Sequence, residues 1–176
     1  MAEEGLKLLI SPSEIASKVS ELAQRILADH GEDELVLVGT LKGSFIFLAD
    51  LVRALDKRGV FIDFVRVKSY GYSDTSSGEV VITKDVELPL EGKTVIIVED
   101  IVDTGLTVKF LLEHLKLHRP KVLKVCALIN KMERRKVNVP LHYVGFVVER
   151  GFLVGYGLDY AEKYRHLPGV YEVVKA

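Results

Sequence analysis

Hydrophobic positions recur along the chain with two different periods, and these predict helices alternating with strands. Ser11-Pro12-Ser13-Glu14 has the pattern of a helix start: a capping serine, proline at the first helical position and glutamate at the third. The apolar residues that follow recur every three or four positions as far as Gly31, which predicts an amphipathic helix. Further apolar stripes predict helices over 45–55 and 104–118.

Short apolar runs predict the strands. Leu35-Val36-Leu37-Val38 and Val95-Ile96-Ile97-Val98 contain no polar residue, as expected of strands that are covered on both faces. The other predicted strands span 61–67, 80–82, 122–129 and 144–148. Strands that alternate with helices are typical of parallel βαβ crossovers, so the pattern predicts an α/β fold with a mainly parallel sheet.

The predicted topology also indicates where a ligand would bind. Ligands of open α/β sheets bind outside the carboxyl ends of the strands. The candidate ligand loops are therefore 39–44, 99–107 and the segment after Ile129. The stretch 69–78 has almost no aliphatic residues and is rich in serine and glycine, so we expect a mobile loop there.

Composition narrows the class of protein. The length of 176 residues suits one domain, and 24 basic against 25 acidic residues argue against an electrostatically driven nucleic-acid binder. The single cysteine, Cys126, excludes an internal disulfide and is expected in the core. Since no apolar run is long enough for a membrane span, we expect a cytoplasmic protein without membrane or nucleic-acid partners.

Three acidic residues, Glu99, Asp100 and Asp103, end the second apolar strand just before a predicted helix. Helix N-termini bind phosphate through free backbone N–H groups, and Thr104 and Thr107 add hydroxyl donors. Carboxylates are ligands that Mg²⁺ prefers. This segment predicts a ligand that carries both a phosphate and metal-binding oxygens. The alternative is a solvated acidic turn with a helix cap.

Residues 95–107 resemble the phosphoribosyl diphosphate (PRPP) motif of type I phosphoribosyltransferases. Leu41-Lys42-Gly43 resembles their pyrophosphate loop, and Ser69-Tyr70-Gly71 resembles their lid. Lys131 matches the purine-site lysine, and Phe152 to Tyr160 followed by Arg165 resembles the C-terminal purine and metal segment. The order is consistent over about residues 8–170, and the resemblance is specific to hypoxanthine-guanine phosphoribosyltransferases.

The resemblance implies a fold and a reaction. The fold would be a mainly parallel central sheet flanked by helices, with a small hood formed by the N- and C-terminal segments. Residues 1–176 would form one domain, with a lid at 69–79 and a hood and purine segment at 150–170. The reaction would move 5-phosphoribose from PRPP to a 6-oxopurine, hypoxanthine or guanine, giving IMP or GMP and pyrophosphate with Mg²⁺. A homodimer or homotetramer is also implied.

The resemblance further implies roles for the residues that bind PRPP and carry out the reaction. Asp103 would be the general base that accepts the proton of purine N7. Glu99 and Asp100 would bind the ribose, and with Asp159 they would hold Mg²⁺. The residues around the 5′-phosphate would be Asp103, Thr104, Gly105, Leu106 and Thr107. Pyrophosphate would contact Lys42, Gly43 and Arg165, with a non-proline cis peptide between Leu41 and Lys42. Ser69 and Tyr70 would close as a lid.

The purine would contact Lys131, Phe152, Leu153 and Asp159 on the same resemblance. An ammonium only donates hydrogen bonds, so Lys131 suits the 6-oxo group and disfavours the 6-amino group of adenine. Without the motif, Lys131 reads as the start of a solvated charged run over 131–136. Two functional alternatives stay open: a regulatory protein on this fold that binds nucleic acid, and an enzyme that prefers xanthine.

His114 and His118 are four residues apart on a predicted helix and could face the same way. The zinc-protease pattern requires His-Glu-x-x-His, and the sequence offers no evident third ligand. We therefore do not predict a metal site at this pair.

Overall fold

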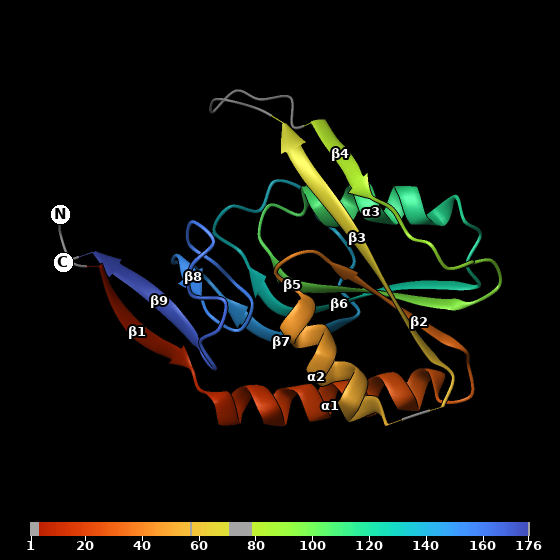
Figure 1. The fold of residues 1–176 in the computed structure, drawn as a ribbon, viewed down its shortest axis with the longest axis horizontal. Helices are drawn as coiled ribbons and strands as arrows, with labels where there is room; N and C mark the ends of the chain where they lie inside the picture. The colour runs from red at the N-terminus through yellow and green to blue at the C-terminus, as the bar shows by residue number, and fades with distance from the viewer. Residues whose placement is uncertain (1–3, 57, 71–78, 176) are drawn as a thin grey trace.

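The computed structural model describes residues 4–56, 58–70 and 79–175, and it contains a large and a small sheet (Figure 1). The large sheet has the order β4-β3-β2-β5-β6-β7. Its strands are β2 (Leu35–Thr40), β3 (Val60–Tyr70), β4 (Glu79–Lys84), β5 (Thr94–Val102), β6 (Val122–Lys131) and β7 (Tyr143–Val148). All neighbours pair parallel except β3 and β4, so the predicted α/β fold is confirmed.

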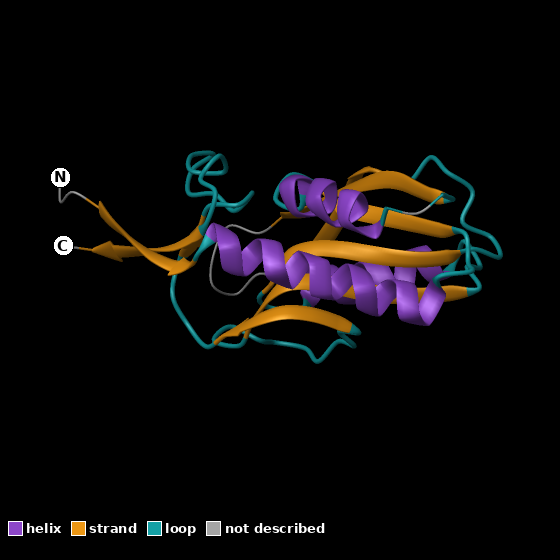
Figure 2. Ribbon diagram, turned by 90° about the horizontal axis from the view of Figure 1, so that it is seen from below, coloured by secondary structure: helices purple, strands orange, loops and turns teal. Residues whose placement is uncertain are grey.

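Helices cover both faces of the large sheet. α1 (Pro12–His30) and α2 (Phe45–Leu55) pack on one face, and α3 (Leu106–Lys116) packs on the other (Figure 1). Figure 2 looks onto the side where α1 lies along the strands. Alternate residues of the buried strands point into two separate cores, so Leu37 packs with α1 and α2 while Val38 packs with α3. No helix within the described ranges is long and apolar enough to cross a membrane.

Local signals in the sequence explain the helix boundaries on the first face. Ser11 caps α1 through its side chain, and Glu14 reciprocates by accepting from the Ser11 backbone N–H at 2.8 Å. α2 covers the predicted residues 45–55, and Gly31 is the C-cap of α1. These predictions are confirmed.

The small sheet lies at one end of the large one. It has the order β1-β9-β8, with antiparallel pairing between β1 (Glu4–Ile10), β8 (Leu153–Val154) and β9 (Val170–Lys175) (Figure 1). We call these three strands and the connection 155–169 the hood. The periodicity analysis predicted none of these strands, but the hood that the resemblance implied is confirmed.

The segment after Val98 differs from the prediction. Residues 99–102 continue β5 because β6 runs alongside and pairs Glu99 with Ala127 and Val102 with Asn130. The loop therefore starts only at Asp103, and α3 is shorter than the predicted helix 104–118.

The predicted mobile loop 69–78 is also partly corrected. Ser69 and Tyr70 are the last residues of β3, where they pair with Val80 and Glu79. The rest of that loop, 71–78, lies outside the described residues, so the predicted lid is not tested there.

Candidate active site

A cavity of about 260 Å³ opens at the carboxyl ends of β2 and β5. This is the edge of the sheet at which the topology predicts a ligand. Among the predicted site residues, five line this cavity: Glu99, Asp103, Thr104, Gly105 and Thr107. The acidic strand end and the following helix start thus face one space.

The loop 103–107, which we call the phosphate loop, turns directly into α3 at Gly105. Gly105 has φ +85°, and a Cβ there would come within 2.6 Å of the Val137 carbonyl oxygen, so only glycine fits. The first-turn N–H groups of a helix have no partner within the helix and attract anions. Leu106 N–H donates to the Thr104 hydroxyl at 3.3 Å, which helps to hold the turn. The local geometry therefore suits a phosphate.

Two adjacent carboxylates lie at the end of β5. Glu99 is buried, and its Oε1 has no hydrogen-bond partner among the described residues. Burial, followed by the charge of Asp100, raises the pKa of Glu99 well above its usual value. Burial also raises the pKa of Asp100 to about 6, against the opposing effects of backbone hydrogen bonds and of Arg165. Two buried acids side by side, with Arg165 offsetting only part of the cost of their charge, fit a site for a divalent cation.

Burying the charged Asp100 carboxylate costs free energy of folding, which predicts that Asp100→Asn stabilises the ligand-free protein. Because the folded pKa of Asp100 lies above the unfolded one, its contribution to stability is present below about pH 4 and lost as the pH rises through 6. The neutral amide avoids that loss. We expect a gain of roughly 1–3 kcal/mol at pH 8 and a smaller gain at pH 5, measured by thermal unfolding. A variant that melts below the parent at pH 8 would contradict this.

The Leu41–Lys42 peptide is cis, as the resemblance implies. Gly43 follows it and is closely packed on two sides. A Cβ on Gly43 would lie 1.9 Å from Asp100 Oδ2, and a Cβ on Gly157 would lie 2.1 Å from the Gly43 carbonyl oxygen. Gly43 therefore joins the end of β5 to the hood through contacts that have no room for a side chain.

Replacing Gly43 with alanine should disturb the site without unfolding the protein. The new methyl group would push the Asp100 carboxylate away, and for PRPP, the ligand that the resemblance implies, we expect the affinity to fall by about tenfold. Direct PRPP binding and thermal unfolding measure the two effects separately. Gly92→Ala is the control for PRPP affinity alone: its Cβ would meet open space, while its φ of +72° strains an alanine and lowers stability without touching the site. Equal PRPP affinity in both variants would refute the packing argument.

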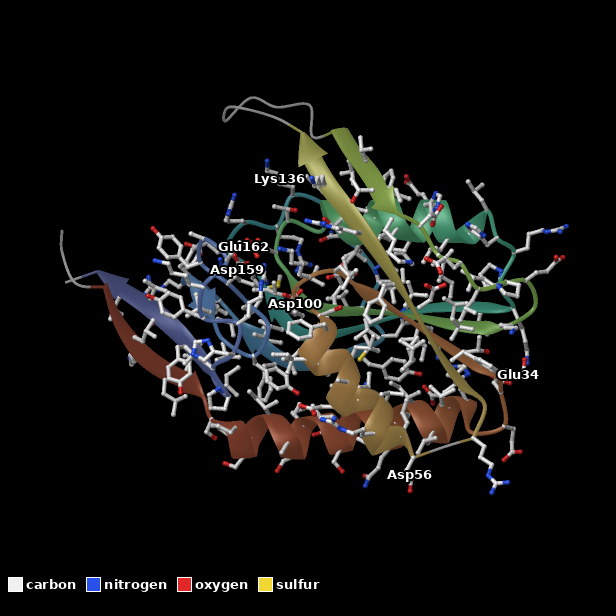
Figure 3. The ribbon with its side chains drawn as sticks, in the orientation of Figure 1. Glu34, Asp56, Asp100, Lys136, Asp159 and Glu162 are labelled. Carbon is white, nitrogen blue, oxygen red and sulfur yellow. The ribbon has the colours of Figure 1, made fainter. Side chains whose placement is uncertain are left out.

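Ion pairs connect the loop 41–43 to the hood. Lys42 Nζ lies 2.8 Å from Glu162 Oε2, and Arg165 Nη2 lies 3.4 Å from Glu162 Oε1 and 3.1 Å from Asp159 Oδ1. Arg165 also donates to the Gly157 carbonyl oxygen at 2.7 Å. The charge of Asp159 also acts on the pKa of Asp100, and Figure 3 labels both residues. Predicted pyrophosphate and metal residues from three distant segments therefore gather in one place.

Lys131 is the last residue of β6, and the solvated-run interpretation of it is wrong. Its side chain is only 8% exposed, and its Nζ lies 3.7 Å from Asp103 Oδ2 and 3.4 Å from Glu133 Oε2. Asp103 Oδ1 is buried and has no hydrogen-bond partner among the described residues. The fold thus places a buried ammonium beside the predicted base.

Phe152 and Leu153 lie on the hood side of the site. Phe152 is half exposed and packs edge-to-face on Tyr160, with ring centroids 5.4 Å apart. Leu153 is buried in β8. Neither residue lines the 260 Å³ cavity, so the structure does not bring these two predicted purine residues to the phosphate loop.

Sequence reasoning missed Arg135. Its guanidinium donates to the carbonyl oxygens of Asp103 at 2.9 Å, Val102 at 3.1 Å and Lys131 at 3.1 Å, and also to the Asn130 side chain. It therefore joins the phosphate loop to the end of β6. The signal in the sequence was its position in the charged run directly after Lys131, which was otherwise interpreted as solvated.

Comparisons with known proteins agree with this geometry. The phosphoribosyl transferase domain family matches residues 11–161. The hypoxanthine-guanine phosphoribosyltransferase of Aquifex aeolicus is 52% identical over 169 residues, which cover 96% of this chain and 94% of its own. This chain belongs to the hypoxanthine-guanine phosphoribosyltransferase family.

Further members of the family match the chain over nearly its full length. The hypoxanthine phosphoribosyltransferase of Escherichia coli is 42% identical over 172 residues, 96% of each chain. A crystal structure of a Bacillus anthracis hypoxanthine-guanine phosphoribosyltransferase has a TM-score of 0.90 at 46% identity, covering 98% of this chain and 100% of that chain. This phosphoribosyltransferase is an enzyme of purine salvage rather than a regulatory protein on the same fold.

Proposed function

We propose that this phosphoribosyltransferase joins hypoxanthine or guanine to the 5-phosphoribose of PRPP, giving IMP or GMP. The bond from a purine nitrogen to ribose C1′ forms as the bond from C1′ to the pyrophosphate oxygen breaks, and the proton of purine N7 passes to Asp103. The observation that carries the proposal is the buried Lys131 ammonium 3.7 Å from the Asp103 carboxylate, beside the phosphate loop. One group can hold an oxopurine while the other accepts its proton.

PRPP binding is assigned to three segments. The phosphate loop holds the 5′-phosphate through the backbone of Asp103, Thr104, Gly105, Leu106 and Thr107. Glu99 and Asp100 hold the ribose hydroxyls. Lys42, Gly43 and Arg165 hold pyrophosphate. The ion pairs that Lys42 and Arg165 make with Glu162 support this, because the diphosphate of PRPP can replace that carboxylate when it binds.

Glu99, Asp100 and Asp159 would hold Mg²⁺, since all three are oxygen donors. Among the residues that the structure describes, Arg165 is the cation that acts on the adjacent pair Glu99 and Asp100. When bound, the metal supplies positive charge that offsets the charge of the leaving pyrophosphate. The protein contributes a rigid strand end that places the carboxylates before the substrate arrives.

The purine site is assigned to Lys131, Phe152, Leu153 and Asp159. Lys131 donates to the 6-oxo oxygen, the exposed Phe152 ring stacks on the base, and the backbone of Leu153 and Asp159 contacts the purine edge. Ser69 and Tyr70 belong to a lid over 69–79 that excludes water from the reacting centre.

A product assay tests the proposal. Purified protein is mixed with PRPP, Mg²⁺ and one base at a time: hypoxanthine, guanine, xanthine or adenine. We expect nucleoside monophosphate from hypoxanthine or guanine and little from adenine. Preferential use of xanthine would favour the alternative of a xanthine enzyme, and no product from any base would overturn the proposal.

Arg135 is proposed as a positioning residue for both substrates. Arg135→Lys keeps the charge but loses the planar guanidinium that donates to three carbonyl groups. The phosphate loop should therefore be held less firmly against the end of β6. We expect kcat and the affinity for PRPP each to fall by roughly three- to tenfold. Arg58→Lys, on the exposed surface, is the matched control.

Arg135→Ala should lower kcat further than Arg135→Lys and should also unfold at a lower temperature, because the carbonyl groups lose their donor altogether. If the melting temperature falls and the kinetic constants of the folded enzyme do not change, Arg135 has only a structural role.

Residues 1–176 are proposed as one domain with the hood and purine segment at 150–170. A cytoplasmic location is proposed as well, supported by the single buried thiol of Cys126. A homodimer or homotetramer is supported by exposed apolar side chains at Leu8, Leu9 and Phe45. Light scattering coupled to gel filtration distinguishes these assemblies from a monomer.

A further inference from the structure

The opposite end of α3 from the phosphate loop carries a second cluster of potential metal ligands. His114 lies in the last turn of α3, His118 follows in the turn beyond it, and Asp85 comes directly after β4. His114 Nε2 lies 3.0 and 2.9 Å from the two Asp85 carboxylate oxygens. One ligand atom from each of the three side chains lies within 4.8 Å of the others. The fold thus supplies the third ligand that the sequence did not reveal.

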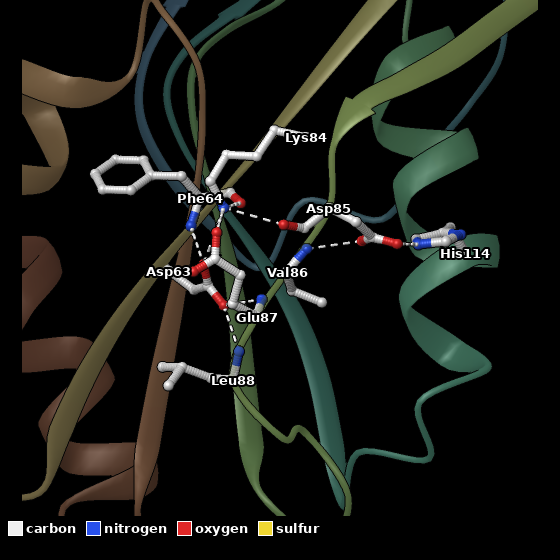
Figure 4. A network of polar contacts seen from close by, with 8 residues as sticks. All are labelled: Asp63, Phe64, Lys84, Asp85, Val86, Glu87, Leu88 and His114. Carbon is white, nitrogen blue, oxygen red and sulfur yellow. Dashed lines mark hydrogen bonds and ion pairs between the residues drawn. The ribbon is translucent and has the colours of Figure 1, made fainter.

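The surroundings hold these side chains in place. Val86 N–H donates to Asp85 Oδ1 at 2.8 Å, and the carboxylate lies between that N–H and His114 (Figure 4). The Phe110 ring stacks parallel to the His114 ring, and the His118 ring meets His114 edge-on at 5.5 Å. Outer contacts of this kind orient metal ligands.

The local charges also favour a cation. The cluster lies at the C-terminal end of α3, where the helix dipole is negative. Lys84, which directly precedes Asp85, directs its Nζ to the Asp85 carbonyl oxygen at 3.0 Å and to the Asp63 and Glu87 carboxylates at 3.5 and 3.0 Å. Lys84 therefore leaves the Asp85 carboxylate unpaired with its own charge, so that carboxylate can bind a cation. His114 and Asp85 keep 24% and 42% of their side chains exposed, so an ion can enter.

We propose that Asp85, His114 and His118 bind a divalent cation of the zinc type. Two imidazole nitrogens and a carboxylate oxygen suit Zn²⁺ or Co²⁺ with water in the fourth position, whereas Mg²⁺ favours oxygen ligands alone. The ion ties the connection between β4 and β5 to the end of α3. Since α3 has 11 residues, the site lies about 16 Å along the helix from the phosphate loop, so its role is structural.

Zinc and cobalt titrations of the full chain test this proposal. Saturating Mg²⁺ is present throughout to occupy the carboxylate site of the active centre. We expect one equivalent of Zn²⁺ to bind by calorimetry and Co²⁺ to give the visible absorption of tetrahedral coordination. The bound ion should also raise the temperature of unfolding.

His118→Ala removes one ligand and leaves the Asp85–His114 pair, so the fold is retained. We expect Zn²⁺ affinity to fall at least tenfold, the cobalt absorption to disappear, and turnover with Mg²⁺ to match the parent. His166→Ala, an exposed histidine in the hood, is the control and should bind Zn²⁺ like the parent. Absence of Zn²⁺ binding, or equal binding by His118→Ala, would overturn the proposal.

Discussion

Asp103→Asn is expected to lower kcat by roughly 10²–10⁴-fold while PRPP affinity changes little. The amide keeps the shape of the carboxylate but cannot accept the purine proton. The contacts that Asp103 makes with Arg135 use its backbone carbonyl oxygen, so the phosphate loop keeps its position in the variant. The loss should therefore appear in turnover and not in the binding of PRPP.

Single-turnover kinetics and a separate PRPP binding measurement check this prediction. Asp56→Asn is the matched control, because it makes the same chemical change at an exposed residue that ends α2, far from the site (Figure 3). Undiminished turnover in Asp103→Asn would refute the assignment of the base. A large loss of PRPP affinity with unchanged turnover would instead assign Asp103 to substrate binding.

Lys131→Met should lower kcat/KM for hypoxanthine by about 10- to 100-fold, because one charged hydrogen bond to the 6-oxo oxygen is lost. Methionine fills the buried volume of the lysine stem without its ammonium, so the loss reflects chemistry rather than packing. The ratio of hypoxanthine to adenine use should fall by a similar factor, since the donor that rejects a 6-amino group is gone.

Rates with both bases for parent and variant measure this selectivity. Lys136→Met is the control, because Lys136 belongs to the same charged run but is exposed and contacts Thr104 through its backbone N–H. If Lys131→Met discriminates against adenine as strongly as the parent does, another group reads the 6-position.

Periodicity alone located the main elements of the large sheet and the helices that cover its faces. It succeeded because those elements bury one face or both, and burial imposes a regular pattern of apolar residues. It missed β1, β8 and β9, which are short or keep much of their surface exposed: Leu8 and Val174 are 49% and 40% exposed. The hood was predicted by the family resemblance and not by the pattern of apolar residues.

The acidic strand end, the helix start after it and their phosphate chemistry are properties of neighbouring residues, so the sequence by itself determined them. Only the tertiary structure decided which distant residues meet them. Parallel pairing of β5 with β6 brings Lys131 to Asp103, and the return of the chain through the hood brings Gly157 against Gly43. The same is true of Asp85 and His114, which are 29 residues apart and meet only because α3 packs beside the end of β4. Contacts of this kind depend on how whole elements pack, and no local pattern of residues records that packing.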